Sequence, residues 1–91
     1  MRIVKLIEEK LTAALHPHQL EVIDESHLHA GHGGARPEGE THFRVVIVSP
    51  LFEGESRVAR HRMVTKVLAA EMNNPIHALA LKTQTPKEAD V

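Results

Sequence analysis

The sequence predicts a small α+β domain whose elements follow in the order helix, strand, strand, helix, strand. Two segments, residues 3–15 and 56–72, repeat apolar residues every three or four positions, which is typical of amphipathic helices. Three shorter segments, 20–25, 41–48 and 76–83, are rich in alternating and β-branched apolar residues, as strands are. Ninety-one residues, 42% of them hydrophobic, are enough for one domain with a modest core.

The two predicted helices have clear boundary signals. The first carries Ile3, Ile7 and Leu11 on one face, and we expect Pro17 to end it. Ser49 followed by Pro50 is typical of a capped turn, which Gly54 then breaks. The second helix follows and is expected to stop at Asn73, Asn74 and Pro75.

The connections between the strands predict a mixed sheet. A glycine-rich loop over residues 27–40 joins the first two strands, which favours antiparallel pairing. The second and third strands are joined through a helix, which favours a right-handed parallel crossover. Both helices then cover one face of the three-stranded sheet. The tail from Pro86 to Val91 is expected to fray.

The amino-acid composition limits the metal ligands that the chain can supply and the partners that its charge can attract. The chain has eight histidines and no cysteine, so it carries imidazole metal ligands but no thiolate ligand for iron–sulfur chemistry. Its net charge is −1, and protonation of all eight histidines would change it to +7. There is no basic excess for nonspecific phosphate binding. We expect no signal peptide, no membrane span, and a reducing compartment.

Four histidines are candidate ligands. His27, His29 and His32 lie in the glycine-rich segment that leads into the second strand, and His77 begins the third. If these strands are parallel, both sources of imidazole enter the sheet at the same end. Spacing alone favours the more ordinary interpretations, which are an exposed polar loop and a His77 that is satisfied by a backbone partner at the edge of the core.

Two other histidines receive structural interpretations. His42 could be a third ligand, but its alternation with Phe43 is more typical of a surface histidine. His61 lies one turn before Val64, so we interpret it as a residue that leans toward the core.

A basic run in the second predicted helix is the best signal for a nucleic-acid or partner surface. Its members are Arg57, Arg60, Arg62 and Lys66. A solvated helix face is the ordinary interpretation of such a run. The turn before this helix, residues 52–55 (FEGE), has two acids in place of the Gly-x-x-Gly loop that clamps phosphates in K-homology domains, and stacking aromatics are scarce.

Nothing in the sequence predicts an enzyme. Glu25, Ser26 and His27 are adjacent in sequence, whereas a catalytic triad needs residues that converge in space. No phosphate loop, nucleotide-binding fingerprint or zinc-binding helix motif is present.

Five segments, in their order and spacing, together resemble the BolA family over about residues 3–86. They are residues 24–26 (DES), 41–45 (THFRV), 52–54 (FEG), 60–62 (RHR) and 76–81 (IHALAL). The resemblance implies one BolA-like domain over residues 1–86, similar to the class II K-homology fold, with a flexible tail at 87–91. It also implies a cytoplasmic adaptor that pairs with a monothiol glutaredoxin in iron–sulfur trafficking or iron regulation.

The resemblance further implies the site. His77 and a loop histidine, His29 by its position, would be ligands of a [2Fe–2S] cluster shared with the glutaredoxin and its glutathione. His27 and His32 are alternative loop ligands, and no cofactor is expected on the chain alone. Some family members are described as DNA-binding regulators, so DNA is the rival partner, through the basic helix. A pH-sensing or zinc-binding module, and a weak homodimer of the free chain, stay open.

Overall fold

The computed structural model describes residues 2–25, 42–72, 76 and 78–90. Along these residues the elements follow in the order α1 (Arg2–Leu15), β1 (Gln19–Asp24), β2 (His42–Val48), the 3-10 helix η2 (Pro50–Phe52), α2 (Arg57–Val67), β3 (Ala78–Gln84) and α3 (Pro86–Ala89). The predicted order of helix, strand, strand, helix, strand is confirmed. No helix in the described part of the chain is long and apolar enough to cross a membrane.

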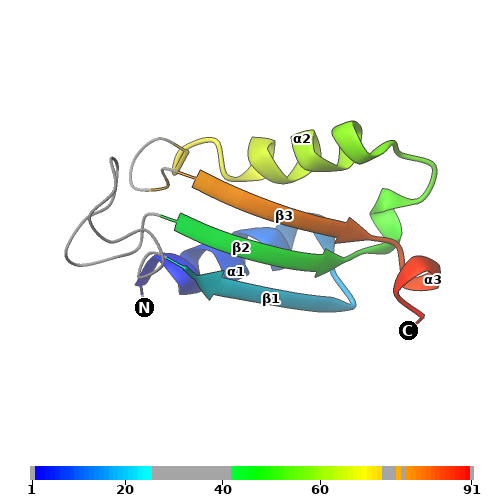
Figure 1. Cartoon of the computed structure of the whole chain (residues 1–91), viewed down its shortest axis with the longest axis horizontal. Coiled ribbons are helices and arrows are strands. Elements are labelled where there is room, and N and C mark those ends of the chain that lie inside the picture. Colours follow the sequence, from blue (N-terminus) through cyan, green and yellow to red (C-terminus); the bar gives the residue numbers. More distant parts are fainter. Residues whose placement is uncertain (1, 26–41, 73–75, 77, 91) are drawn as a thin grey trace.

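The sheet has the predicted mixed topology (Figure 1). Its strand order is β1-β2-β3, with β1 antiparallel and β3 parallel to the central strand β2. In the parallel ladder His42 lies opposite Ala78, and Val48 lies opposite Gln84. The first residues of β2 and β3 are therefore neighbours at one end of the sheet.

The core lies between one face of the sheet and the two long helices. Side chains of α1, β2, η2 and α2 form one buried cluster that includes Ile7, Leu11, Val45, Phe52 and Val64. Both helices therefore pack on the same face, as predicted, and α1 lies behind the sheet in Figure 1. On the other face the side chains include exposed charged residues such as Glu21, Arg44 and Lys82.

Ser49 joins the elements that meet at the carboxyl end of β2. Its hydroxyl is fully buried, donates to the Leu15 carbonyl at 2.6 Å and accepts from the Leu51 amide at 3.1 Å. Its own amide donates to the Gln84 carbonyl at 2.9 Å. The capped turn predicted at Ser49 is confirmed. After this turn the chain passes through Gly54, whose φ is 77°.

The helix α2 is shorter than predicted. It ends at Val67, whereas the apolar periodicity predicts a helix as far as Met72. Beyond it, Glu71 is buried and its carboxylate pairs with Lys10 of α1 at 2.7 Å. Met72 forms an isolated parallel bridge with Ile76. Residues 68–71 form turns in place of a continued helix, and the pair of Glu71 with Lys10 connects them to α1.

The frayed tail predicted from Pro86 is wrong for the residues that the structure describes there. Pro86–Ala89 form the helix α3, which begins with a capping box. The Thr85 hydroxyl accepts from the Glu88 amide at 3.1 Å, and the Glu88 carboxylate accepts from the Thr85 amide at 2.9 Å. Two donors that a helix start leaves unpaired are thereby satisfied.

Candidate functional site

The candidate site is the end of the sheet where β2 and β3 begin. His42 and Ala78 are the first residues of these strands and are paired in the parallel ladder. This confirms that the second and third strands begin at the same end. The candidate ligands His27, His29, His32 and His77 lie outside the described residues, so their assignment stays a prediction.

His42 is the described histidine at this end, and the prediction of an ordinary surface histidine is wrong for it. Only 7% of His42 is exposed. Its strand is central, so Glu25 flanks it on one side, where the Glu25 amide donates to the His42 carbonyl at 2.7 Å. Ala78 flanks it on the other side. Burial at the start of a central strand is not visible in the alternation of the sequence.

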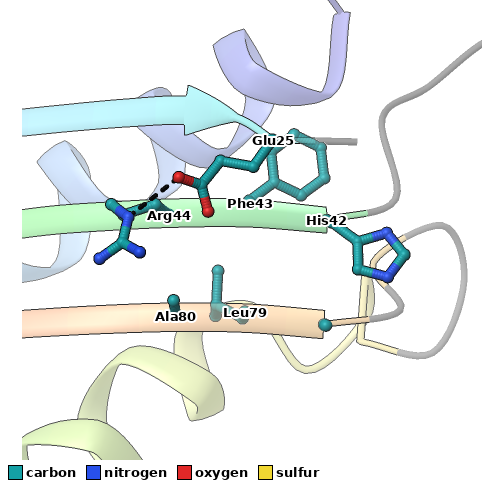
Figure 2. A pocket seen from close by; sticks show the side chains of 7 residues that line it. Glu25, His42, Phe43, Arg44, Leu79 and Ala80 are labelled. Carbon is teal, nitrogen blue, oxygen red and sulfur yellow. Dashed lines mark hydrogen bonds and ion pairs between the residues drawn. The ribbon is translucent and has the colours of Figure 1, made fainter. Parts of the chain in front are cut away.

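A depression of about 430 Å³ opens beside His42 (Figure 2). Its lining residues come from all three strands or their ends, and they are Glu25, His42, Phe43, Arg44, Ala78, Leu79 and Ala80. Ala78 and Ala80 are exposed and contribute only methyl groups. The Arg44 Nε donates to Glu25 Oε2 at 3.0 Å and forms the side opposite His42. The depression therefore offers a small apolar floor between an imidazole and an ion pair.

Metal binding by the described residues alone is limited. Among them, no three His, Asp or Glu side chains lie where they could hold a metal ion. His61 is half-buried, and within the same residues its Nε2 is buried without a hydrogen-bond partner. That position agrees with the structural role predicted for His61.

The basic run in α2 does not act as one surface, because Arg60 is held inside the fold. Its side chain is 13% exposed and pairs with Glu88 of α3 at 2.6 Å. It also donates to the backbone carbonyls of Glu55 at 3.0 Å and Thr83 at 3.3 Å, and its guanidinium lies 5.9 Å from the centre of the Phe52 ring. The structure therefore assigns Arg60 to the attachment of α3, where the sequence predicts a binding residue.

The ion pair between Arg60 and Glu88 shifts the pKa of both groups. Hydrogen bonds from Arg60, the larger cause, and from the Thr85 backbone together lower the pKa of Glu88 from 4.5 to about 2. The hydrogen bond to Glu88 raises the pKa of Arg60. Both groups therefore stay charged at neutral pH.

The other three members of the run, Arg57, Arg62 and Lys66, are exposed as predicted. Arg57 lines a groove together with Arg44 of β2 and Lys82 of β3. Arg44 and Lys82 are not part of the basic run in the sequence, because they lie on β2 and β3, far along the chain from α2. Alternation in the strands places both on the open face of the sheet, and this was the available signal.

Comparisons with known proteins agree with this fold. The family model described as BolA-like protein matches residues 11–88. The DNA-binding transcriptional regulator BolA of Escherichia coli is 50% identical over 97% of this chain and 80% of its own length. The human BolA-like protein 1 is 48% identical over 90% of this chain, which spans 57% of that protein.

Solved structures show the same similarity. The BolA domain of SufE1 from Arabidopsis thaliana superposes with a TM-score of 0.83 at 44% identity, over 97% of this chain and 94% of that one. The solution structure of BolA1 from Mus musculus superposes with a TM-score of 0.82 at 38% identity, over 99% of this chain and 70% of that one. With the fold, the family model and these relatives in agreement, the chain belongs to the BolA family.

Proposed function

We propose that this protein is an adaptor that pairs with a monothiol glutaredoxin and supplies histidine ligands to a shared [2Fe–2S] cluster. The observation that supports this is the parallel start of β2 and β3, with His42 opposite Ala78. The histidine-rich segment leads directly into His42, and His77 directly precedes Ala78. Two histidine-bearing segments therefore join the sheet at neighbouring positions.

The donor set of the chain fits a shared centre. His77 and His29 would be the ligands, with His27 and His32 as alternatives, while the partner would contribute a cysteine and a glutathione thiolate. Imidazole ligation raises the potential of such a cluster, and imidazole can be protonated and released. Ala78 and Ala80 have short side chains that do not protrude from the sheet beside this position. A second protein can therefore approach the sheet closely there.

In this proposal the protein acts in the cytoplasm, has no catalytic activity of its own, and binds no cofactor when alone. Its contribution is ligation and docking. Release of an imidazole ligand on protonation would make transfer of the cluster easier at lower pH.

The test is to mix the chain with cluster-loaded glutaredoxin and record visible circular dichroism. We expect the wild type to change the spectrum and His77→Ala to reduce that change. Single substitutions of His27, His29 and His32 by Ala identify the loop ligand. His18→Ala is the matched control, because His18 is exposed and its amide bonds the Val48 carbonyl at the opposite end of the sheet. A double variant, His29→Ala with His77→Ala, that keeps the full spectral change would refute the proposal.

A second function, DNA binding, is favoured by one observation beyond the relative's name: Arg57, Arg62 and Lys66 are exposed on α2. Against DNA binding, both phenylalanines of the chain are buried, at 2% and 0% exposed, so neither can stack on a base. Affinity for DNA should fall steeply with salt concentration, whereas cluster-dependent pairing should require iron and glutathione. Measuring both dependences separates the two functions.

A further inference from the structure

A second groove, of about 520 Å³, includes the second half of β3, an edge strand of the described sheet, and extends to Arg44 on the open face of the sheet. It is bordered by the start of α2 and by α3, and it is lined by Arg44, Arg57, Arg60, Leu81, Lys82, Thr83, Gln84 and Glu88. It shares Arg44 with the depression beside His42 but extends toward the opposite end of the sheet. The candidate cluster site does not account for it.

The side chains that line this groove carry a net positive charge, whereas the net charge of the chain is slightly negative. Four lining side chains are cations and one is an acid, although the whole chain has a net charge of −1. Arg60 neutralises the acid, Glu88. Arg57 and Lys82 are exposed and make no ion pair with any residue that the structure describes. Arg44 uses its Nε for Glu25, while both of its Nη atoms point away from that carboxylate (Figure 2).

The backbone of β3 offers further groups to the same groove. The Gln84 carbonyl faces β2, where it accepts from the Ser49 amide, and the Thr83 carbonyl faces away, where it accepts from Arg60. Because backbone groups along a strand alternate between its two sides, the amide and carbonyl of Leu81 face the groove as those of Thr83 do. In the described sheet β3 is an edge strand, and the edge of a sheet can pair with an extended peptide.

We propose that this groove binds an extended, acidic peptide segment of a protein partner. The peptide backbone would pair with Leu81, and its carboxylates would lie opposite Arg57, Lys82 and the Nη atoms of Arg44. A nucleic acid suits the groove less well, because Glu53 and Glu55 immediately precede α2 and both phenylalanines are buried. This inference is independent of the shared cluster and needs neither iron nor glutaredoxin.

The probe is a fluorescein-labelled decapeptide that alternates Glu with Val, and its binding to the full chain is followed by fluorescence anisotropy at low salt. Exposed charge pairs each contribute modestly, so reversing two cations should weaken binding by about tenfold, which is about 1.4 kcal/mol. The variant is Arg57→Glu with Lys82→Glu. The matched control is Lys5→Glu with Lys66→Glu, which makes the same change in charge at two exposed lysines outside the groove. Thermal unfolding of each variant verifies that it is folded.

Three further measurements decide the result. A peptide with Gln in place of Glu should bind much more weakly, and nuclear magnetic resonance should show the largest amide shifts near Leu81. A single-stranded oligonucleotide of equal charge should bind less tightly than the acidic peptide. Equal binding of the Gln peptide, unchanged binding by the double variant, or tighter binding of the oligonucleotide would each overturn the proposal.

Discussion

The two ends of the sheet are built differently. At the carboxyl ends of β2 and β3, Ser49, Arg60 and Glu88 connect five separate elements through hydrogen bonds and an ion pair. At the amino ends, His42 and Ala78 border an open depression with a floor of methyl groups. We call the carboxyl end the closed end and the amino end the open end. The difference indicates that, among the described residues, polar contacts hold the closed end together more than the open end.

The largest effect should come from the aromatic side chain at the closed end. Phe52 is fully buried beneath the Arg60 guanidinium, so Phe52→Ala should lower the free energy of unfolding by about 3–5 kcal/mol. Its neighbour Leu51 is 46% exposed, and Leu51→Ala should change it by about 0.5 kcal/mol or less. Urea unfolding measures both, and equal losses would contradict the assignment of Phe52 to the core.

The next effect should come from the buried hydroxyl. Ser49→Ala leaves the Leu15 carbonyl and the Leu51 amide without their partner, at a cost of about 1–3 kcal/mol. Ser56 is the exposed cap of α2, and Ser56→Ala should cost about 1 kcal/mol. If urea unfolding shows Ser56→Ala to be the more damaging change, the closed end is less important to stability than its contacts indicate.

A smaller effect is expected at the open end. The pair of Glu25 with Arg44 is partly exposed, at 20% and 51% of the two side chains, so Glu25→Gln should cost about 0–1 kcal/mol. The same urea measurement applies. A loss of several kcal/mol would show that this end also holds the fold together, and the contrast between the two ends would fail.

The smallest effect is a pH dependence at the closed end. The pKa of Glu88 is about 2 in the folded chain against 4.5 otherwise, so its ion pair stabilises the fold above pH 4.5. That contribution should be lost as the pH falls from 4.5 toward 2. Glu88→Gln lacks the titrating carboxylate, so the stability difference between wild type and variant should shrink over this window. A difference that does not change with pH would contradict the pairing of Glu88 with Arg60.

The sequence predicts the order of the elements and the mixed sheet, because apolar periodicity and chain connectivity carry that information. It overextends α2 because the contacts that end this helix, such as Glu71 with Lys10, join residues distant in sequence. The helix α3 was predictable: Thr85, Pro86 and Glu88 have the spacing of a capping box with proline at the first position.

The site residues were harder to predict. His42 alternates with Phe43 as a surface residue would, and its burial comes from being flanked by Glu25 and Ala78 on neighbouring strands. Arg57 and Arg60 have the same residue type and lie on the same helix, yet one is exposed and the other is bound to Glu88. Contacts with Thr83 of β3 and Glu88 of α3, which are distant in sequence, distinguish the two arginines.

The parallel pairing of β3 with β2 also has a consequence for protein synthesis. Because β3 follows α2 in the chain, a nascent chain that has not released residues 78–84 from the ribosome can pair only β1 with β2 in this sheet. Pairing across a long separation in sequence also forms more slowly than local contacts do. The edge that we propose as the docking site is therefore completed only after α1, β2 and α2 have emerged.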